Sequence, residues 1–139
     1  MKIECFLDTN VLVYAMAGRK NELRKHEIAI DMFRRSGFGL SGQVLAEFAS
    51  VIDRKFRDHV SLPELDRWID MLSRFPVIPV DVPLVQAGIL YARRYQITYY
   101  DAAIVAAAER LGAPVLYTED LNHGQVYGSV KVINPFSPH

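Results

Sequence analysis

The stretch ITYYDAAIVAAAERLGAPVLYTED, residues 97–120, contains the clearest signal of the fold. Its alanine-rich part, residues 100–111, is predicted to form a helix that Gly112 ends. The apolar residues 115–117 are predicted to form a short strand directly afterwards. A helix joined by a short loop to a strand of a parallel sheet runs antiparallel to that strand, so this stretch is predicted to be one helix–strand unit of an α/β sheet.

The rest of the chain continues this alternation of strand and helix. Strands are expected at residues 3–7, 38–40, 77–80 and 129–133, and helices at residues 21–35, 43–55, 61–75 and 82–95. The first of these helices is expected to end at Ser36 and Gly37. Such an order predicts an α/β fold, namely a three-layer α/β/α sandwich around a central parallel sheet of about four to five strands.

Length and composition are typical of one compact globular domain, which we place over residues 1–139. Half of the residues (50%) are hydrophobic and 23% are charged. Sixteen basic residues balance sixteen acidic ones, so no global field draws the chain to nucleic acid. Local phosphate contacts could come from basic pairs, although any single pair is more often a solvated helix face. These pairs are Arg19–Lys20, Arg24–Lys25, Arg34–Arg35, Arg54–Lys55 and Arg93–Arg94.

The sequence predicts no membrane association and a cytoplasmic location. The apolar stretch 102–108 is far shorter than the roughly 18–20 residues that a membrane-spanning helix needs. Residues 1–7 have no basic segment followed by a long apolar one, and they are predicted to form a strand rather than a signal for export. The one cysteine, Cys5, lies in this strand, where we expect it to be a packing residue in a reducing compartment.

Four acidic residues, Asp8, Glu47, Asp101 and Asp120, are predicted to meet at one edge of the sheet. Asp8 and Asp120 directly follow predicted strands, and the carboxyl ends of parallel strands share an edge. Helices that return from this edge begin there, which places Asp101 in a first turn and Glu47 about one turn inside its helix. The acids come from distant parts of the sequence, so their convergence is the main indication of function.

Each acid also has a structural interpretation. Thr98 and Asp101 resemble a capping box, Asp8 could form a turn, and Asp120 could be a loop residue. Asp101 and Glu47, however, each share a helical face with apolar residues, and a buried carboxylate costs several kcal/mol unless it is paired or bound to metal. Crowded carboxylates favour a divalent cation between them. Mg²⁺ or Mn²⁺ suits these hard oxygen ligands, and metal ions held by carboxylates recur in enzymes that cut phosphodiester bonds.

Four segments together carry a resemblance to a known family. They are FLDTNVLVY (residues 6–14), GQVLAEF (residues 42–48), residues 97–121 and the following NHGQ (residues 122–125). With these segments the chain resembles, over nearly its whole length, the PIN domain family and within it the VapC-like toxin ribonucleases. The resemblance implies a PIN-like, Rossmann-like sandwich and a Mg²⁺- or Mn²⁺-dependent endoribonuclease acting on RNA. It also implies a homodimer and a co-expressed antitoxin that binds over or near the active site.

The resemblance also implies roles for individual residues. Asp8, Glu47, Asp101 and Asp120 match the acidic quartet of the family, as catalytic residues and metal ligands. Asn10 and Thr118 match positions that orient the carboxylates or the attacking water by hydrogen bonds. Glu119 ranks below Asp120 as a site residue, and His123 is expected to be a loop histidine without a defined role. Apart from the resemblance, Tyr99 and Tyr100 lie at the start of the helix that contains Asp101; such aromatic residues are more often core than interface, but these two could stack on bases.

Other functions remain open at this stage. The chain could be a PIN nuclease with a housekeeping role in RNA processing, or a non-catalytic module that binds metal or an antitoxin. A phosphatase or receiver domain with a phosphorylated aspartate also places an aspartate after its first strand. The segment Asp8-Thr9-Asn10 lacks the second aspartate of the phosphatase pattern, and Lys131 falls inside a predicted strand rather than at its end.

Overall fold

The computed structural model describes residues 2–35 and 37–137, in which six strands and six helices alternate along most of the chain. The elements in chain order are β1 (Cys5–Leu7), α1 (Thr9–Ala17), α2 (Leu23–Arg34), β2 (Phe38–Ser41), α3 (Gly42–Lys55), α4 (Leu62–Leu72), β3 (Val77–Ile78), α5 (Val82–Tyr95), α6 (Tyr99–Arg110), β4 (Val115–Tyr117), β5 (Val126–Tyr127) and β6 (Val130–Ile133). The predicted end of α2 falls partly on Ser36, which lies outside the described residues, as does Met1 of the predicted first strand.

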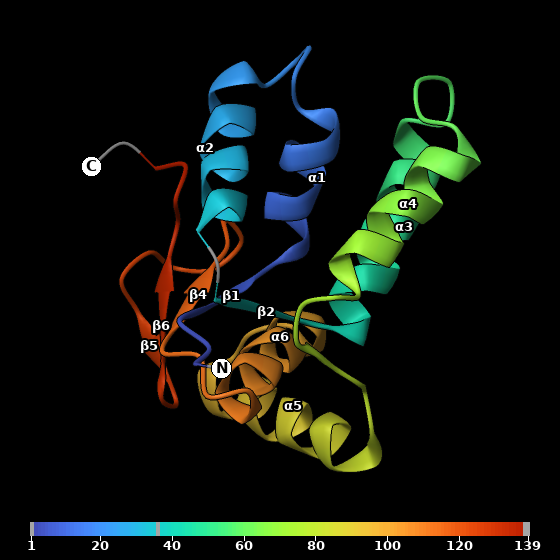
Figure 1. Cartoon of the computed structure of the whole chain (residues 1–139). Helices are drawn as coiled ribbons and strands as arrows, with labels where there is room; N and C mark the ends of the chain where they lie inside the picture. The colour runs from blue at the N-terminus through green and yellow to red at the C-terminus, as the bar shows by residue number, and fades with distance from the viewer. Residues whose placement is uncertain (1, 36, 138–139) are drawn as a thin grey trace.

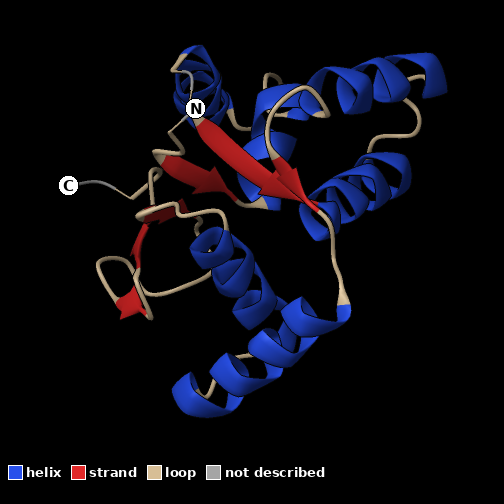
Figure 2. Ribbon diagram, turned by 60° about the horizontal axis from the view of Figure 1, so that its bottom comes forward, coloured by secondary structure: helices blue, strands red, loops and turns tan. Residues whose placement is uncertain are grey.

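The strands form one sheet in the order β3-β2-β1-β4-β6-β5, and every neighbouring pair is parallel except β5 with β6. Figure 1 shows α1 and α2 side by side on one face of the sheet and α5 and α6 on the other face. Helices α3 and α4 lie against each other, next to the sheet. In the turned view of Figure 2 the strands form a layer between helices. The predicted α/β fold is therefore confirmed: β3, β2, β1, β4 and β6 form the predicted parallel sheet, and β5 adds a sixth, antiparallel strand at its edge.

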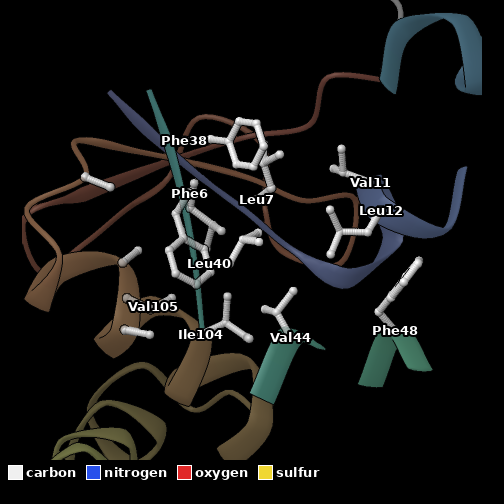
Figure 3. Packing of buried hydrophobic residues seen from close by; sticks show 14 of the residues in the cluster. Phe6, Leu7, Val11, Leu12, Phe38, Leu40, Val44, Phe48, Ile104 and Val105 are labelled. Atoms are coloured by element: carbon white, nitrogen blue, oxygen red, sulfur yellow. The ribbon is translucent and has the colours of Figure 1, made fainter. Parts of the chain in front are cut away.

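The central strand β1 is buried on both faces, which explains why its sequence is almost wholly apolar. Phe6 and Leu7 are both 0% exposed. Their side chains point to opposite faces, so that Phe6 lies toward Ile104 of α6 in Figure 3 while Leu7 lies on the other side of the sheet. Because β1 pairs with β2 on one side and β4 on the other, the residue that follows it emerges at the middle of the sheet edge.

Helix α6 packs between the sheet and α5, and its buried residues run without a break from Ala102 to Ala108. This explains its alanine-rich sequence, because small side chains let α5 and the sheet approach from both sides. Gly88 of α5 makes the closest approach, since a Cβ atom there would lie 2.9 Å from Cε1 of Tyr99. No helix among the described residues is long and apolar enough to cross a membrane.

The strand β5 was not expected from the sequence. It forms a hairpin with β6 through a two-residue turn, Gly128-Ser129, in which Gly128 has a φ of 59°. Glu109 of α6 anchors this turn, because its Oε2 atom accepts hydrogen bonds from the backbone N–H and the hydroxyl of Ser129, at 2.8 and 2.9 Å. Tyr91 donates a further hydrogen bond to Glu109, and this bond raises the pKa of Tyr91 to about 12.

The hairpin turn gives a matched pair of stability predictions. Gly124 and Gly128 both have positive φ, so alanine at either position should cost about 1–2 kcal/mol of backbone strain. A Cβ atom at Gly128 would also lie 2.5 Å from Oε2 of Glu109, whereas nothing lies within 4 Å of one at Gly124. We therefore expect Gly128→Ala to lower the free energy of unfolding in urea by about 1–3 kcal/mol more than Gly124→Ala. Equal losses would contradict the anchoring role of Glu109.

Candidate active site

A cavity of about 400 Å³ opens at the carboxyl ends of β1 and β4, and all four predicted acids line it. Asp8 lies directly after β1, and Asp120 lies in the loop after β4. Asp101 is in the first turn of α6, and Glu47 is about one turn inside α3. The structure thus brings the four acids to one cavity, as the sheet-edge argument predicts, while their roles as ligands stay a prediction.

Asp8 is the most buried of the four acids, with 6% of its surface exposed. It caps α1, because its Oδ1 atom accepts a hydrogen bond from the backbone N–H of Thr9 at 2.7 Å. Burial raises the pKa of the Asp8 carboxyl to about 6. The hydrogen bonds from Thr118 and Thr9 oppose this rise. The negative charges of Asp120 and Glu47 add to it.

The hydroxyl of Thr118 joins three of the predicted site residues. Its Oγ1 atom donates to Oδ2 of Asp8 at 2.7 Å and accepts from the backbone N–H of Asp120 at 3.1 Å. The amide of Asn10 donates to Oδ2 of Asp120 at 3.2 Å and to Oγ1 of Thr118 at 3.3 Å. Asp120 is exposed at the cavity, and partial desolvation of its carboxyl together with the charge of Asp101 raises its pKa, against the hydrogen bond from Asn10. Asn10 and Thr118 therefore hydrogen-bond to the carboxylates of Asp120 and Asp8, while their supporting role in the site stays a prediction.

Glu47 is held by two residues that the sequence reasoning did not single out. The hydroxyl of Thr9 donates to its Oε2 atom at 3.3 Å, and the amide of Gln43 donates to its Oε1 atom at 2.8 Å. Gln43 also donates to the backbone carbonyl of Tyr100 at 3.1 Å, which ties α3 to the start of α6. The spacing of Gln43 and Glu47, one helical turn apart, is a readable signal for this contact.

Asp101 combines the two interpretations that its sequence left open. Thr98 caps α6, and its Oγ1 atom accepts a hydrogen bond from the backbone N–H of Asp101 at 3.4 Å. The Asp101 side chain at the same time lines the acidic cavity. A carboxylate at this position is favoured by the helix dipole, which lowers the cost of placing it beside other acids.

Glu119 and His123 have structural partners. Glu119 accepts a hydrogen bond from the hydroxyl of Tyr14 at 2.6 Å and forms an ion pair with Lys25 at 3.0 Å. It lines the cavity, but its charge is already balanced, which agrees with its lower rank. Nδ1 of His123 accepts a hydrogen bond from the backbone N–H of Asn134 at 3.0 Å, so this ring braces the C-terminal segment.

The donors of the cavity fit a hard divalent cation in their chemistry. They are carboxylate oxygens, with the pKa values of Asp8 and Asp120 raised in part by neighbouring acids, together with Oδ1 of Asn10, a buried oxygen without a hydrogen-bond partner among the described residues. They do not form a finished coordination shell, since no three His, Cys, Asp or Glu side chains in the described ranges form a group that could hold an ion. A cation would therefore have to draw these side chains together against their repulsion.

Comparisons with known proteins agree with this geometry. The family model described as the PIN domain matches residues 5–129. No curated protein shows a significant match to the chain. A toxin–antitoxin complex from Klebsiella pneumoniae is similar in structure, with a TM-score of 0.71, 19% identity, and 95% of this chain and 98% of that chain covered.

Two further solved structures show the same fold at low identity. One is VapC20 of Mycobacterium tuberculosis, described as a toxin that cleaves the sarcin-ricin loop, with a TM-score of 0.64, 16% identity, and 84% and 92% of the two chains covered. The other is VapBC2 of Rickettsia felis bound to a DNA fragment from its promoter, with a TM-score of 0.62, 16% identity, and 94% and 97% covered.

The raised pKa of Asp8 predicts that this residue lowers the free energy of unfolding by an amount that depends on pH. Its neutral form is favoured in the folded state, so the stability that it contributes is present below its ordinary pKa of 3.8 and is lost as pH rises through about 6. The loss amounts to about 3 kcal/mol. Asp8→Asn should therefore raise the free energy of unfolding, relative to the unmodified chain in EDTA, by about that much more at pH 7.5 than at pH 4.

The control for this experiment is Asp53→Asn. Asp53 forms only an exposed ion pair with Arg57, so its replacement should change the free energy of unfolding by less than about 1 kcal/mol at either pH. A difference between Asp8→Asn and the unmodified chain that stays the same at pH 4 and pH 7.5 would show that the Asp8 carboxyl is not perturbed by burial.

Proposed function

The chain belongs to the PIN domain family, and on that premise we propose that it is a Mg²⁺- or Mn²⁺-dependent endoribonuclease, the toxin of a type II toxin–antitoxin pair. The observation that carries the proposal is the single cavity lined by Asp8, Glu47, Asp101 and Asp120. Crowded acids cost stability, since the charges of Asp120 and Glu47 add to the raised pKa of Asp8, and a function that needs a divalent cation accounts for that cost.

We propose that Asp8, Asp101 and Asp120 hold the ion, with Glu47 completing the site or positioning a second ion. A divalent ion there supplies charge neutralisation at the phosphate oxygens and a lowered pKa of the attacking water. The chain's own residues prepare this site. Thr118 and Asn10 orient Asp8 and Asp120 by hydrogen bonds, and Gln43 orients Glu47.

Hydrolysis of this kind breaks the bond between phosphorus and the 3′ oxygen and does not use the 2′-hydroxyl of RNA. The same site is therefore chemically able to cut DNA, and an assay should include both nucleic acids. The selectivity for RNA must come from the surface around the cavity rather than from the acids.

Replacement of the acids tests the proposed reaction. Asp8→Asn and Asp101→Asn should each lower the rate of RNA cleavage in Mg²⁺ by roughly 100-fold or more, because each removes a charged ligand. Glu119→Gln is the matched control, since Glu119 lines the same cavity but is paired with Lys25. Its cleavage rate should stay within a few-fold of the unmodified chain. Full activity of either aspartate variant would reject the proposed site.

Metal removal separates an enzyme from a module that only binds an antitoxin. Calorimetric titration should show Mg²⁺ or Mn²⁺ binding that Asp8→Asn abolishes. At a hundredfold excess over the dissociation constant the metal should stabilise the unmodified chain by about 2.7 kcal/mol. EDTA should stop RNA cleavage, and added Mn²⁺ should restore it. Cleavage that persists in EDTA would contradict a metal-dependent mechanism.

The proposed partners are an antitoxin and a second copy of the chain. Toxin–antitoxin complexes among the solved structures of the same fold favour an antitoxin. Exposed apolar side chains on α5, namely Val82, Ile89 and Leu90, favour a contact with another copy. Light scattering in solution should then give about twice the chain's mass of 15.8 kDa. A small upstream gene for a DNA-binding antitoxin would favour the toxin over a housekeeping nuclease.

A further inference from the structure

We propose that the groove between α3 and α6 beside the acidic cavity binds one nucleotide of a single-stranded RNA. In this arrangement Tyr100 stacks on the base, while Arg54 and Lys55 contact the flanking phosphates. The inference rests on the proposed nuclease function and adds to it the conformation of the substrate and the residues that hold it. We call this surface the Tyr100 groove, and its lining residues are Ala46, Glu47, Ser50, Val51, Arg54 and Tyr100.

The Tyr100 groove is continuous with the acidic cavity. Glu47, Val51 and Tyr100 line both of them, so a chain that leaves the cavity along α3 enters the groove directly. The groove is a shallow, open hollow of about 560 Å³, a shape that suits a base lying flat on the surface rather than a fully enclosed ligand. Small side chains, Ala46 and Ser50, are part of its wall, which leaves room for a flat ring beside Tyr100.

The Tyr100 side chain is exposed and does not belong to the hydrophobic core of the described residues. It is 66% exposed, and among the described residues it is the one aromatic side chain that is both large and exposed. Its neighbour Tyr99 instead packs against Gly88 of α5. The two rings meet edge to face at 5.1 Å, and Gln43 holds the backbone carbonyl of Tyr100, so the exposed ring is supported from two sides. A supported, exposed ring beside a nuclease site is suited to stacking on a base.

Two cations share a lining with Tyr100. Arg54 lines the groove and Lys55 lines the acidic cavity, where it is the sole cation among the described lining residues. Basic residues in the last turn of a helix are favoured by its dipole, which alone explains their presence in the sequence. Neither forms an ion pair in the described part of the chain, so both charges are available to a ligand. Free cations along a groove are suited to phosphates.

The groove favours an unpaired nucleotide. A base can stack on Tyr100 only when it has left its own helix, so the substrate is a single strand or a loop rather than a duplex. Stacking accepts every base, because each has a π-face. The Tyr100 groove should therefore contribute affinity near the cut without selecting the base that it holds.

Binding of a fluorescent, single-stranded RNA oligonucleotide, measured by anisotropy in EDTA at low salt, tests the inference without cleavage. Tyr100→Ala should weaken binding roughly 10-fold, whereas Tyr100→Phe, which keeps the ring, should stay within about twofold. Tyr100→Leu is the second variant, since it keeps apolar bulk but loses the ring, and it should bind as weakly as Tyr100→Ala. An RNA duplex should bind more weakly than the single strand.

The cations are tested by the salt dependence of the same binding. Arg54→Ala and Lys55→Ala should each weaken binding and reduce the slope of log K against log salt by about 0.7, the value for one phosphate contact on a single strand. Lys131→Ala is the matched control, because Lys131 is exposed on β6 and should leave the slope unchanged.

The outcomes separate the groove from the nuclease function. Equal binding by Tyr100→Ala and the unmodified chain would overturn the groove, and so would binding of the duplex as tight as that of the single strand or no binding of the oligonucleotide at all. Each of these results leaves the nuclease function intact as long as the unmodified chain cleaves RNA in Mg²⁺. Conversely, a chain that binds through Tyr100 but does not cleave would reject the proposed reaction and keep the groove as a binding site.

Discussion

The burial of Asp8 at the end of the central strand is the constraint on which the rest of the site depends. The backbone N–H of Asp8 donates to the carbonyl of Tyr117 at 3.1 Å, which locks the end of β1 to β4. Its side chain caps α1, so the carboxylate cannot turn away without disrupting the start of that helix. The fold therefore keeps a carboxyl group in a place where its ionised form is disfavoured. The surroundings of Asp8 must therefore compensate the negative charge of its ionised carboxylate.

In the structure, neutral hydrogen-bond donors contact the carboxylates of the cavity. Thr118 donates to Asp8, Asn10 to Asp120, and Gln43 to Glu47. A lysine or arginine in these places would form an ion-pair network that is complete without metal. Hydroxyl and amide donors instead hold the carboxylates in position while leaving most of their negative charge in place. The one acid of the cavity that has a basic partner, Glu119, is also the one that we leave out of the proposed site.

The sequence predicts the position of each acid better than it predicts the contacts between side chains. Whether a residue lies at the carboxyl edge follows from where strands and helices begin and end, and this is visible around Asp8 and Asp101. The pairing of Glu119 with Lys25 joins residues 94 positions apart, and no periodic pattern carries such information. β5 was missed for another reason. Two residues are too short for a periodic signal, although the Gly128-Ser129 pair between apolar residues was a readable sign of a hairpin.

The distribution of charge on the chain determines how the proposed site can bind RNA. The chain has no net charge, and its cavity is lined by acids, so a phosphate backbone gains nothing from the protein's overall field. Approach must then depend on short-range contacts outside the acids. Because Lys55 and Tyr100 line the cavity together with the acids, a proposed RNA substrate would meet a cation and an exposed ring beside the acids. A site built in this way engages few nucleotides, and its selectivity rests on whether a strand can open to reach it.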